Sequence, residues 1–181
     1  MKLFHVITTA TLLSLALLFS VSASAKEFHG HFSGTQFQSA FDINDDGVGA
    51  PDLEGTGRFT QLGNITFRGT SEAFTWDQAS WCSDTEILVE VYYFYMVFTV
   101  PNGDMLVTEM FDGQVCFDIL DFSWESINHF QVTGGTGRFA HATGNFVCEA
   151  KAKPLNPLNY RMGDYYEGDC EGDLENIGSD E

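Results

Sequence analysis

The sequence predicts an all-β protein, a single eight-stranded antiparallel β-barrel, with a two-sheet β-sandwich as the alternative. Apolar and polar residues alternate with period two along most of the chain, which is the pattern of half-buried strands. Glycine-rich turns separate these stretches, and no long segment has an apolar stripe of helical spacing. Short strands in an open sheet leave unpaired edges, and closing the sheet removes them, so the barrel is the preferred architecture.

Eight stretches carry the strand pattern, and turn residues separate them. Gly63-Asn64, Gly144-Asn145 and the Asn102-Gly103-Asp104 sequence favour tight turns, because glycine and asparagine tolerate positive φ. The expected strands, in chain order, are Phe28–Gln38, Gly57–Gln61, Ile65–Phe74, Glu86–Val100, Met105–Met110, Phe122–Val132, Arg138–Val147 and a weaker one near Tyr165.

The fourth expected strand is apolar on both faces. With Glu90 the exception, its two alternating sets are Ile87, Val89, Val91, Tyr93, Tyr95 and Val97, and Leu88, Tyr92, Phe94, Met96 and Phe98. One face can fill a barrel. The other must be covered by the chain's own loops or C-terminal segment, or by another subunit, because large apolar patches are uncommon on soluble monomers. A homo-oligomer is therefore one expected outcome.

The first 25 residues are expected to be a signal peptide. Lys2 gives a positive start, an apolar stretch runs from Leu12 to Val21, and small residues precede a cleavage point after Ala25. The remaining chain would be secreted or periplasmic, with no membrane span after signal removal. The expected organisation is a signal peptide (1–25), a β-barrel domain (26–163) and an acidic C-terminal segment (164–181).

The formal net charge of −18 at pH 7 restricts the partners of the chain. Nucleic acids and anionic membranes would both be repelled, so neither is an expected partner. A strongly acidic protein fits a need for solubility or a cation-rich environment outside the cell.

The four cysteines all follow the expected signal peptide, and an even number in an oxidising compartment predicts two disulfides. Three pairings are compatible with four cysteines. Loops of moderate length favour Cys82–Cys116 with Cys148–Cys170, although spacing alone leaves the other pairings open.

The sequence from Asp42 to Asp52 resembles the opening of a calcium-binding loop. Oxygen-bearing side chains alternate before Gly47, which is the arrangement that a hard cation requires. The twelfth position, which needs a bidentate glutamate, is Leu53, and an Asx-rich turn between two strands explains the same residues. Structural calcium is the cofactor that this segment suggests, and its expected ligands are Asp42, Asn44, Asp46, the backbone carbonyl of Val48, and Asp52.

A candidate ligand-binding site lies on the sixth expected strand. If its aromatic residues, including Phe122, face the barrel interior, alternation carries polar side chains inward with them. A mostly apolar cavity with a few polar groups is typical of small-molecule sites, whereas a filled core with hydrogen-bonded polar groups is the alternative. The candidate lining residues are Trp124, Ser126, Asn128 and Phe130.

Other candidate residues carry less information. Glu90, Glu109, His129 and His141 are the acid–base groups that a cavity could use, although the facing of a strand residue depends on register. His29 and His31 lie two residues apart, on one face of a strand, and could hold a metal ion or form an ordinary exposed pair.

The pentapeptide Gly-Thr-Gly-Arg-Phe occurs twice, at 55–59 and 135–139, and predicts a repeated turn device. The second copy, within the stretch from Val132 to Gly144, resembles the glycine-rich hairpin of the allene oxide cyclase and dirigent-like barrels, especially their secreted bacterial branch. The resemblance implies an eight-stranded antiparallel barrel with a central cavity, often trimeric in plant members. None of the active residues of that superfamily matches a position here.

Three functions fit these observations. The first is binding of a small apolar molecule inside the barrel without catalysis, which we favour. The second is an extracellular structural protein stabilised by disulfides and calcium, with a filled interior. The third is a cyclase- or dirigent-like enzyme, which would need an acid or base inside the cavity. No phosphate-binding loop or nucleophile elbow is present in the sequence, so hydrolase and kinase functions have no support.

Overall fold

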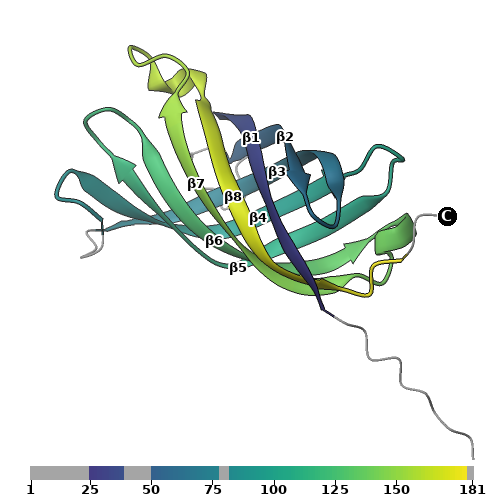
Figure 1. The fold of residues 1–181 in the computed structure, drawn as a ribbon. Helices are drawn as coiled ribbons and strands as arrows, with labels where there is room; N and C mark the ends of the chain where they lie inside the picture. Colours follow the sequence, from purple (N-terminus) through teal and green to yellow (C-terminus); the bar gives the residue numbers. More distant parts are fainter. Residues whose placement is uncertain (1–24, 39–49, 78–81, 179–181) are drawn as a thin grey trace, which may run out of the picture.

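The computed structural model describes residues 25–38, 50–77 and 82–178. They form a closed antiparallel barrel in which each strand pairs with the next and β1 pairs with β8, as Figure 1 shows. The strands are β1 (Lys26–Gln38), β2 (Pro51–Phe59), β3 (Gly63–Asp77), β4 (Glu86–Thr99), β5 (Met105–Asp118), β6 (Trp124–Gly135), β7 (Thr143–Pro154) and β8 (Asp164–Glu175). The predicted barrel is confirmed.

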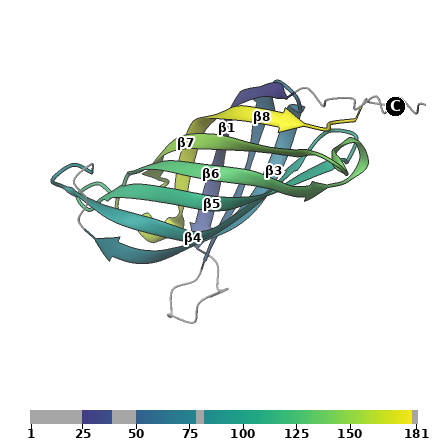
Figure 2. The same ribbon diagram turned by 90° about the horizontal axis from the view of Figure 1, so that it is seen from below.

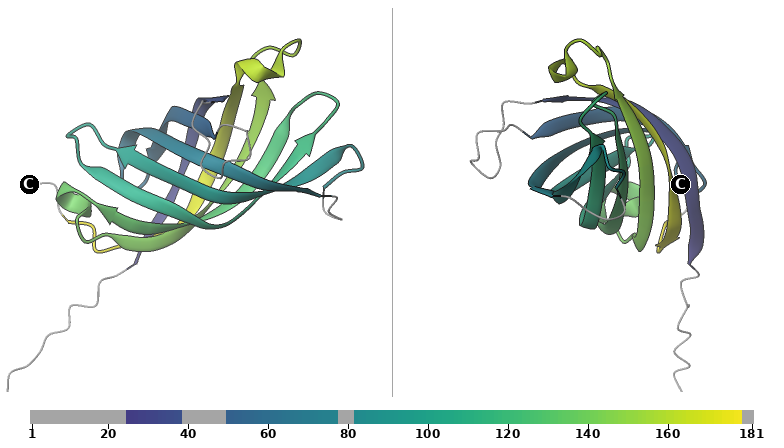
Figure 3. Two further views of the ribbon diagram at one scale, coloured as in Figure 1. Left: turned by 180° about the vertical axis from the view of Figure 1, so that it is seen from behind. Right: turned by 90° about the vertical axis from the view of Figure 1, so that its left-hand side faces the viewer.

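The two ends of the barrel carry different connections. One end holds the β2–β3, β4–β5 and β6–β7 turns, the last of which contains the short 3-10 helix η1 (Gly137–Phe139). The other end holds the remaining connections, including η2 (Tyr160–Met162), which projects beyond the strand ends in Figure 3. Figure 2 shows β8, β7, β6, β5 and β4 side by side along one wall. We refer to the η1 end and the η2 end.

Phenylalanine rings fill the middle of the barrel and its η1 end. The Phe28 ring stacks on Phe59 at 5.0 Å between centroids and lies 4.9 Å from Phe146, which in turn lies 5.4 Å from Phe130. A small apolar cavity of ≈ 10 Å³ remains between Phe32, Phe67, Met96, Phe98 and Cys170. This is about the volume a single water needs, and an apolar lining gives a water no partners. Any larger ligand must therefore bind closer to an end of the barrel.

Inward glycines allow these rings to pack against neighbouring strands. A Cβ atom at Gly55 would lie 2.5 Å from the Phe67 ring, and one at Gly168 would lie 2.8 Å from the Phe32 ring. Both distances are shorter than van der Waals contact, so a larger residue would displace an aromatic ring. Glycine at these positions is thus a packing requirement of the core.

The acidic segment beginning at Asp164 forms β8 and closes the barrel, so the barrel domain extends to Glu175 and does not stop at residue 163. Inward Tyr166, Cys170 and Leu174 are buried, whereas acidic residues such as Asp169 alternate with them and are exposed. A strand can carry many charges on one face, and the high charge of this segment hid its alternation.

Bulges interrupt the alternation of β4 and its neighbours. Val91 and Phe94 both pack against the core although they are three residues apart, so the strand changes facing between them. The pairing shifts register on β3 between Glu72 and Ala73, and on β5 between Met110 and Asp112. Each of the two alternating apolar sets predicted for β4 therefore faces the barrel interior along only part of the strand. The second apolar face expected for β4 is split by the bulge.

The two copies of Gly-Thr-Gly-Arg-Phe adopt different conformations. The first lies within β2 as extended strand, whereas the second ends β6 and forms η1, with Gly137 at φ 53°. The expectation of one repeated turn device is therefore wrong. Both copies nevertheless end in a buried phenylalanine, Phe59 or Phe139, and a turn at the η1 end follows each.

The disulfides are Cys82–Cys116 and Cys148–Cys170, the pairing that loop length favoured. Cys148 and Cys170 face each other across β7 and β8 inside the barrel. Cys82 joins the segment before β4 to β5. Two disulfides are compatible with an oxidising extracellular compartment. No helix among the described residues is long and apolar enough to cross a membrane.

Candidate ligand-binding site

The four candidate residues of β6 line up along its inner side. Ser126 and Asn128 are buried, Phe130 is fully enclosed, and Trp124 is half-buried and packs against the core. Period-two alternation produces this arrangement, because residues two apart point to the same face. Phe122 lies outside the strand, in the preceding turn with φ 62°, so the expected start of this strand at Phe122 is wrong.

Asp164 and Gln36 meet Trp124 near the η2 end. Asp164 begins β8 directly opposite Gln36 of β1. The Gln36 Nε2 atom donates a hydrogen bond of 2.8 Å to Asp164 Oδ2, and Trp124 Nε1 lies 3.4 Å from the same oxygen. Burial raises the pKa of the Asp164 carboxyl, and the bonds from Gln36 and Trp124 partly oppose that rise. The result is a carboxyl group that holds a proton more readily than an exposed aspartate.

The buried Tyr166 lies two residues after Asp164 on β8 and adds a second aromatic ring next to Trp124. Its ring lies 6.2 Å from Trp124 between centroids, and its hydroxyl donates a 3.3 Å hydrogen bond to the backbone carbonyl of Glu54. Burial is the main cause that raises the pKa of Tyr166 far above its usual range, and the charge of Glu54 adds to it. The phenol therefore stays a neutral donor.

Asn128 carries an unused hydrogen-bonding atom deeper along β6. Its Nδ2 atom donates to Ser126 Oγ at 3.1 Å, whereas its buried Oδ1 atom has no partner among the residues that the structure describes. Gly113 lies directly opposite on β5, and a Cβ atom there would lie 2.5 Å from Asn128 Oδ1. A buried acceptor without a partner is costly, so it marks a position where a ligand group or water is expected.

The acid–base groups expected from the sequence lie elsewhere. Glu90 and His141 are exposed. Glu109 accepts a 3.1 Å hydrogen bond from the exposed Tyr95 hydroxyl, and the ring of His129 lies 5.9 Å from that of the exposed Phe111. Asp164 is a half-buried carboxyl group near the η2 end, which the sequence reasoning missed together with Gln36; the Glu72 side chain on β3 is also buried, at 2% exposed. The sequence did contain a signal for Asp164. Residues of the acidic C-terminal segment alternate as in a strand, and this alternation places Asp164 on the same face as Tyr166.

Most of the expected calcium ligands lie outside the described residues, namely Asp42, Asn44, Asp46 and Val48. Asp52 belongs to β2, where it is exposed opposite Phe37 of β1. Calcium binding by this segment stays a prediction. Within the described ranges, the Cys82, Glu86 and Cys116 side chains also lie together, but both cysteines are in a disulfide and offer no thiolate to a metal.

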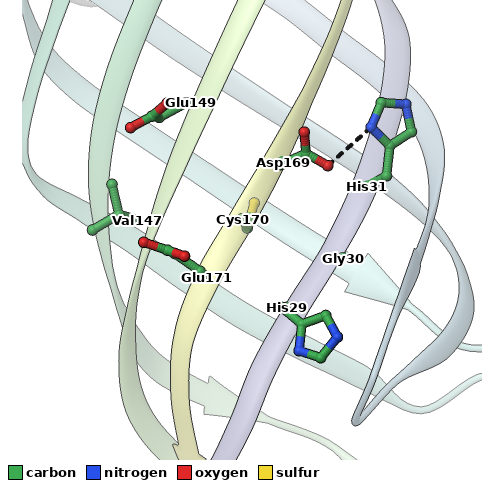
Figure 4. A pocket seen from close by; sticks show the side chains of 8 residues that line it. All are labelled: His29, Gly30, His31, Val147, Glu149, Asp169, Cys170 and Glu171. Atoms are coloured by element: carbon green, nitrogen blue, oxygen red, sulfur yellow. Dashed lines mark hydrogen bonds and ion pairs between the residues drawn. The ribbon is translucent and has the colours of Figure 1, made fainter.

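An exposed groove of ≈ 460 Å³ crosses the outside of β1, β8 and β7, as Figure 4 shows. His29 and His31 stand on β1, Asp169 and Glu171 on β8, and Glu149 on β7. The two histidines do share one face, as their spacing indicates. This groove is separated from the interior site by the wall of the barrel.

Comparison with known proteins adds a distant likeness of fold. No protein-family model and no curated protein matches the chain. A solved structure of a pterocarpan synthase dirigent protein is 16% identical, with a TM-score of 0.40, and the alignment covers 88% of this chain and 91% of that chain. This similarity is too low to assign a family or a function.

Proposed function

We propose that the barrel binds a small, mostly apolar molecule carrying a hydroxyl group, at the inner face of β6 near the η2 end. The observation that carries the proposal is the unpartnered, buried Oδ1 atom of Asn128. A native core pairs such atoms, so a partner supplied by a ligand explains this exception.

The chemistry of the surrounding residues suits this ligand class. Trp124 and Tyr166 offer aromatic surface, and Ser126 and Asn128 offer hydrogen-bonding groups. A ligand hydroxyl both donates and accepts, so it satisfies the amide of Asn128 in either orientation. Asp164 adds a carboxyl group of raised pKa beside Trp124, which would orient a second polar group of the ligand.

Binding outside the cell is part of the proposal. The two disulfides and the expected signal peptide support export, and the strong negative charge would keep the protein soluble there. Structural roles of the outer surface are compatible with the same barrel, but they leave Asn128 Oδ1 unexplained.

A pair of ligand probes tests the proposal. Binding of 2-naphthol and naphthalene is measured by tryptophan fluorescence, and we expect the naphthol to bind at least tenfold more tightly. Asn128→Leu should remove this preference, because it removes the acceptor while keeping a similar volume. Asn145→Leu, on the exposed face of β7, is the matched control. An equal preference in the wild type and in Asn128→Leu would contradict the proposal.

Native mass spectrometry of the protein from its secreting host supplies an independent check. A retained small molecule that is absent from Asn128→Leu would support binding at this site, and its mass would define the ligand class. A retained molecule that persists in Asn128→Leu would locate the binding elsewhere.

A further inference from the structure

The rim of the barrel at the η2 end carries large apolar side chains that are exposed to solvent. Figure 3 shows the β7–β8 connection, which contains η2, projecting beyond the strand ends. Half of the large hydrophobic side chains that are exposed among the described residues belong to this rim, namely Phe37, Ile119, Leu120, Leu155, Leu158 and Met162. Exposed apolar side chains that gather in one region mark a protein or membrane interaction surface.

The segments that carry these side chains leave neighbouring strand ends. Trp124, at the start of β6, pairs with Ala152 near the end of β7, so the turn at 119–123 and the β7–β8 connection begin side by side. At the same end β8 pairs with β1, and a Cβ atom at Gly163 would lie 2.9 Å from the Phe37 ring. The apolar side chains therefore follow the rim from β5 round to β1.

Hydrogen bonds within the β7–β8 connection fix its shape. The Leu155 amide donates a 2.9 Å bond to the backbone carbonyl of Gly163 and closes the base of the connection. The Asn156 side chain accepts a 2.9 Å bond from the Leu158 amide and donates a 3.5 Å bond to Met162 Sδ, so it holds these two residues on either side of it. Leu158 is nevertheless 97% exposed. The connection is thus a fixed projection with an apolar tip.

The charge of this projection differs from that of the chain as a whole. The chain has 26 acidic and 8 basic residues, whereas the segment from Lys151 to Gly163 contains three basic residues and no acidic one. Lys151 is paired with Glu125 of β6 at 2.8 Å, which leaves Lys153 and Arg161 nearer to the tip. A segment without carboxylates can approach phosphate headgroups, while the acidic walls of the barrel are held away from them.

The shape of the projection also favours a lipid surface over a protein. A protein partner must supply a hollow that matches a convex tip, because protein interfaces pack with complementary shapes. Lipids rearrange around an inserted side chain, and the strength of such binding scales with the apolar area that is buried.

We propose that the η2 rim docks on the surface of a zwitterionic phospholipid bilayer, with Leu158 and Met162 inserted at the boundary between headgroups and acyl chains. The small number of inserted side chains makes this binding weak and reversible, and the net charge of −18 makes anionic lipids oppose it. Docking uses none of the residues of the interior site and needs no ligand, so it stands separately from the proposed function.

Co-sedimentation with phosphatidylcholine vesicles, without any added ligand, tests the docking. The protein is purified from its secreting host, and all variants share its N-terminus, so differences between them report on the substituted side chains. We expect the wild type to sediment with the vesicles and L158Q/M162Q to lower the partition coefficient at least tenfold, because it replaces both apolar side chains with polar ones of similar length. Replacing part of the phosphatidylcholine with phosphatidylserine should weaken the binding of the wild type.

A matched control and a contact probe locate the binding surface. M105Q/I127Q changes one methionine and one aliphatic residue that are exposed at the η1 end and on the outer wall of β6, and it should leave the partition coefficient unchanged. Leu158→Trp should add fluorescence that brominated phosphatidylcholine quenches, whereas the fluorescence added by Ile127→Trp should not be quenched.

Four results would overturn the proposal. The first is a folded wild-type protein that does not sediment with vesicles at millimolar lipid. The second is a loss in M105Q/I127Q as large as in L158Q/M162Q, with folding of both verified by circular dichroism. The third is stronger binding to vesicles that contain phosphatidylserine. The fourth is a smaller oligomer in L158Q/M162Q than in the wild type without vesicles, which would assign the rim to an interface between copies of the chain.

Discussion

The guanidinium Nη2 atom of Arg138 donates a 3.3 Å hydrogen bond to the backbone carbonyl of Leu62. Leu62 lies in the turn after the first Gly-Thr-Gly-Arg-Phe copy, and Arg138 belongs to the second copy. The bond therefore ties the two turns of the η1 end together across 76 residues of sequence. Arg138 also lies over the Phe139 ring, 4.7 Å from its centroid.

The two copies allow a matched test of this contact. Arg138→Ala should lower the free energy of unfolding by about 1–2 kcal/mol, because it removes one hydrogen bond and one cation–π contact. Arg58→Ala, at the same position of the first copy, should change it by less than about 0.5 kcal/mol, because Arg58 is exposed on β2. Urea unfolding measures both. Equal losses would show that the turn-to-turn contact has no special role.

Asp164 should make stability depend on pH in a direction opposite to that of most carboxylates. Its folded-state pKa is raised above the ordinary 3.8, so between these two values the folded state holds a proton that the unfolded state has lost. The protonated Asp164 carboxyl contributes to the free energy of unfolding. This contribution is complete below pH 3.8 and is lost as the pH rises through the folded-state pKa. Asp164→Asn keeps an acceptor for Gln36 and does not titrate.

The stability of Asp164→Asn relative to the wild type should therefore increase from acidic to neutral pH and then stay constant. Urea unfolding followed by tryptophan fluorescence at a series of pH values measures the difference. A relative stability that instead increases on acidification would mean that the carboxylate is stabilised in the folded protein.

The buried disulfide should contribute substantially to stability. Cys148 and Cys170 are separated by 22 residues, and constraining the unfolded chain over this length is worth about 3 kcal/mol. The double variant C148A/C170A should lose that amount in chemical denaturation. The variant C82A/C116A, with a separation of 34, gives the comparison for a bond at the rim. A loss below about 1 kcal/mol in C148A/C170A would show that barrel packing alone holds β7 and β8 together.

Phe130 should be among the most sensitive core positions. It is fully buried between Phe94 and Phe146, and Phe130→Ala should cost about 3–5 kcal/mol through lost burial and a residual cavity. Phe111→Ala is the control, because Phe111 is 58% exposed at the bulge of β5. Thermal unfolding of the two variants distinguishes them. A similar loss in both would place Phe111 in a buried interface.

Self-association is expected through the outer face of β4 and β5. Tyr92, Tyr95 and Phe111 are exposed there at 55%, 40% and 58%, and large exposed apolar side chains that lie together mark an interaction surface. Burial of these side chains against a second copy would remove their apolar surface from water. The double variant Y95E/F111E should raise the dissociation constant of the oligomer at least tenfold in analytical ultracentrifugation. A wild-type monomer at high concentration would contradict this prediction.

The fold class was determined by local patterning. Period-two alternation and glycine turns specify strands without reference to the rest of the chain, and they also place Ser126 and Asn128 on one side of β6 with Trp124. Loop length favoured the disulfide pairing without deciding it, and the structure confirms the favoured pairs.

Only the tertiary structure decided the conformation of the repeated pentapeptide and the facing of β4. The same five residues are strand in β2 and a 3-10 turn after β6, because pairing with neighbouring strands overrides their shared propensity. The bulges opposite β4 reverse its facing through register, which no local pattern encodes.

Asp164 became a site residue for the same reason. Its hydrogen bond to Gln36 spans 128 residues and exists because β8 pairs with β1 to close the barrel. The sequence by itself determined which residues alternate, and therefore that the chain is all-β; it favoured a barrel over a two-sheet sandwich, and the pairing of β1 with β8 decided between them. Closure and register determined which carboxyl group faces Trp124, because they depend on pairing between distant strands.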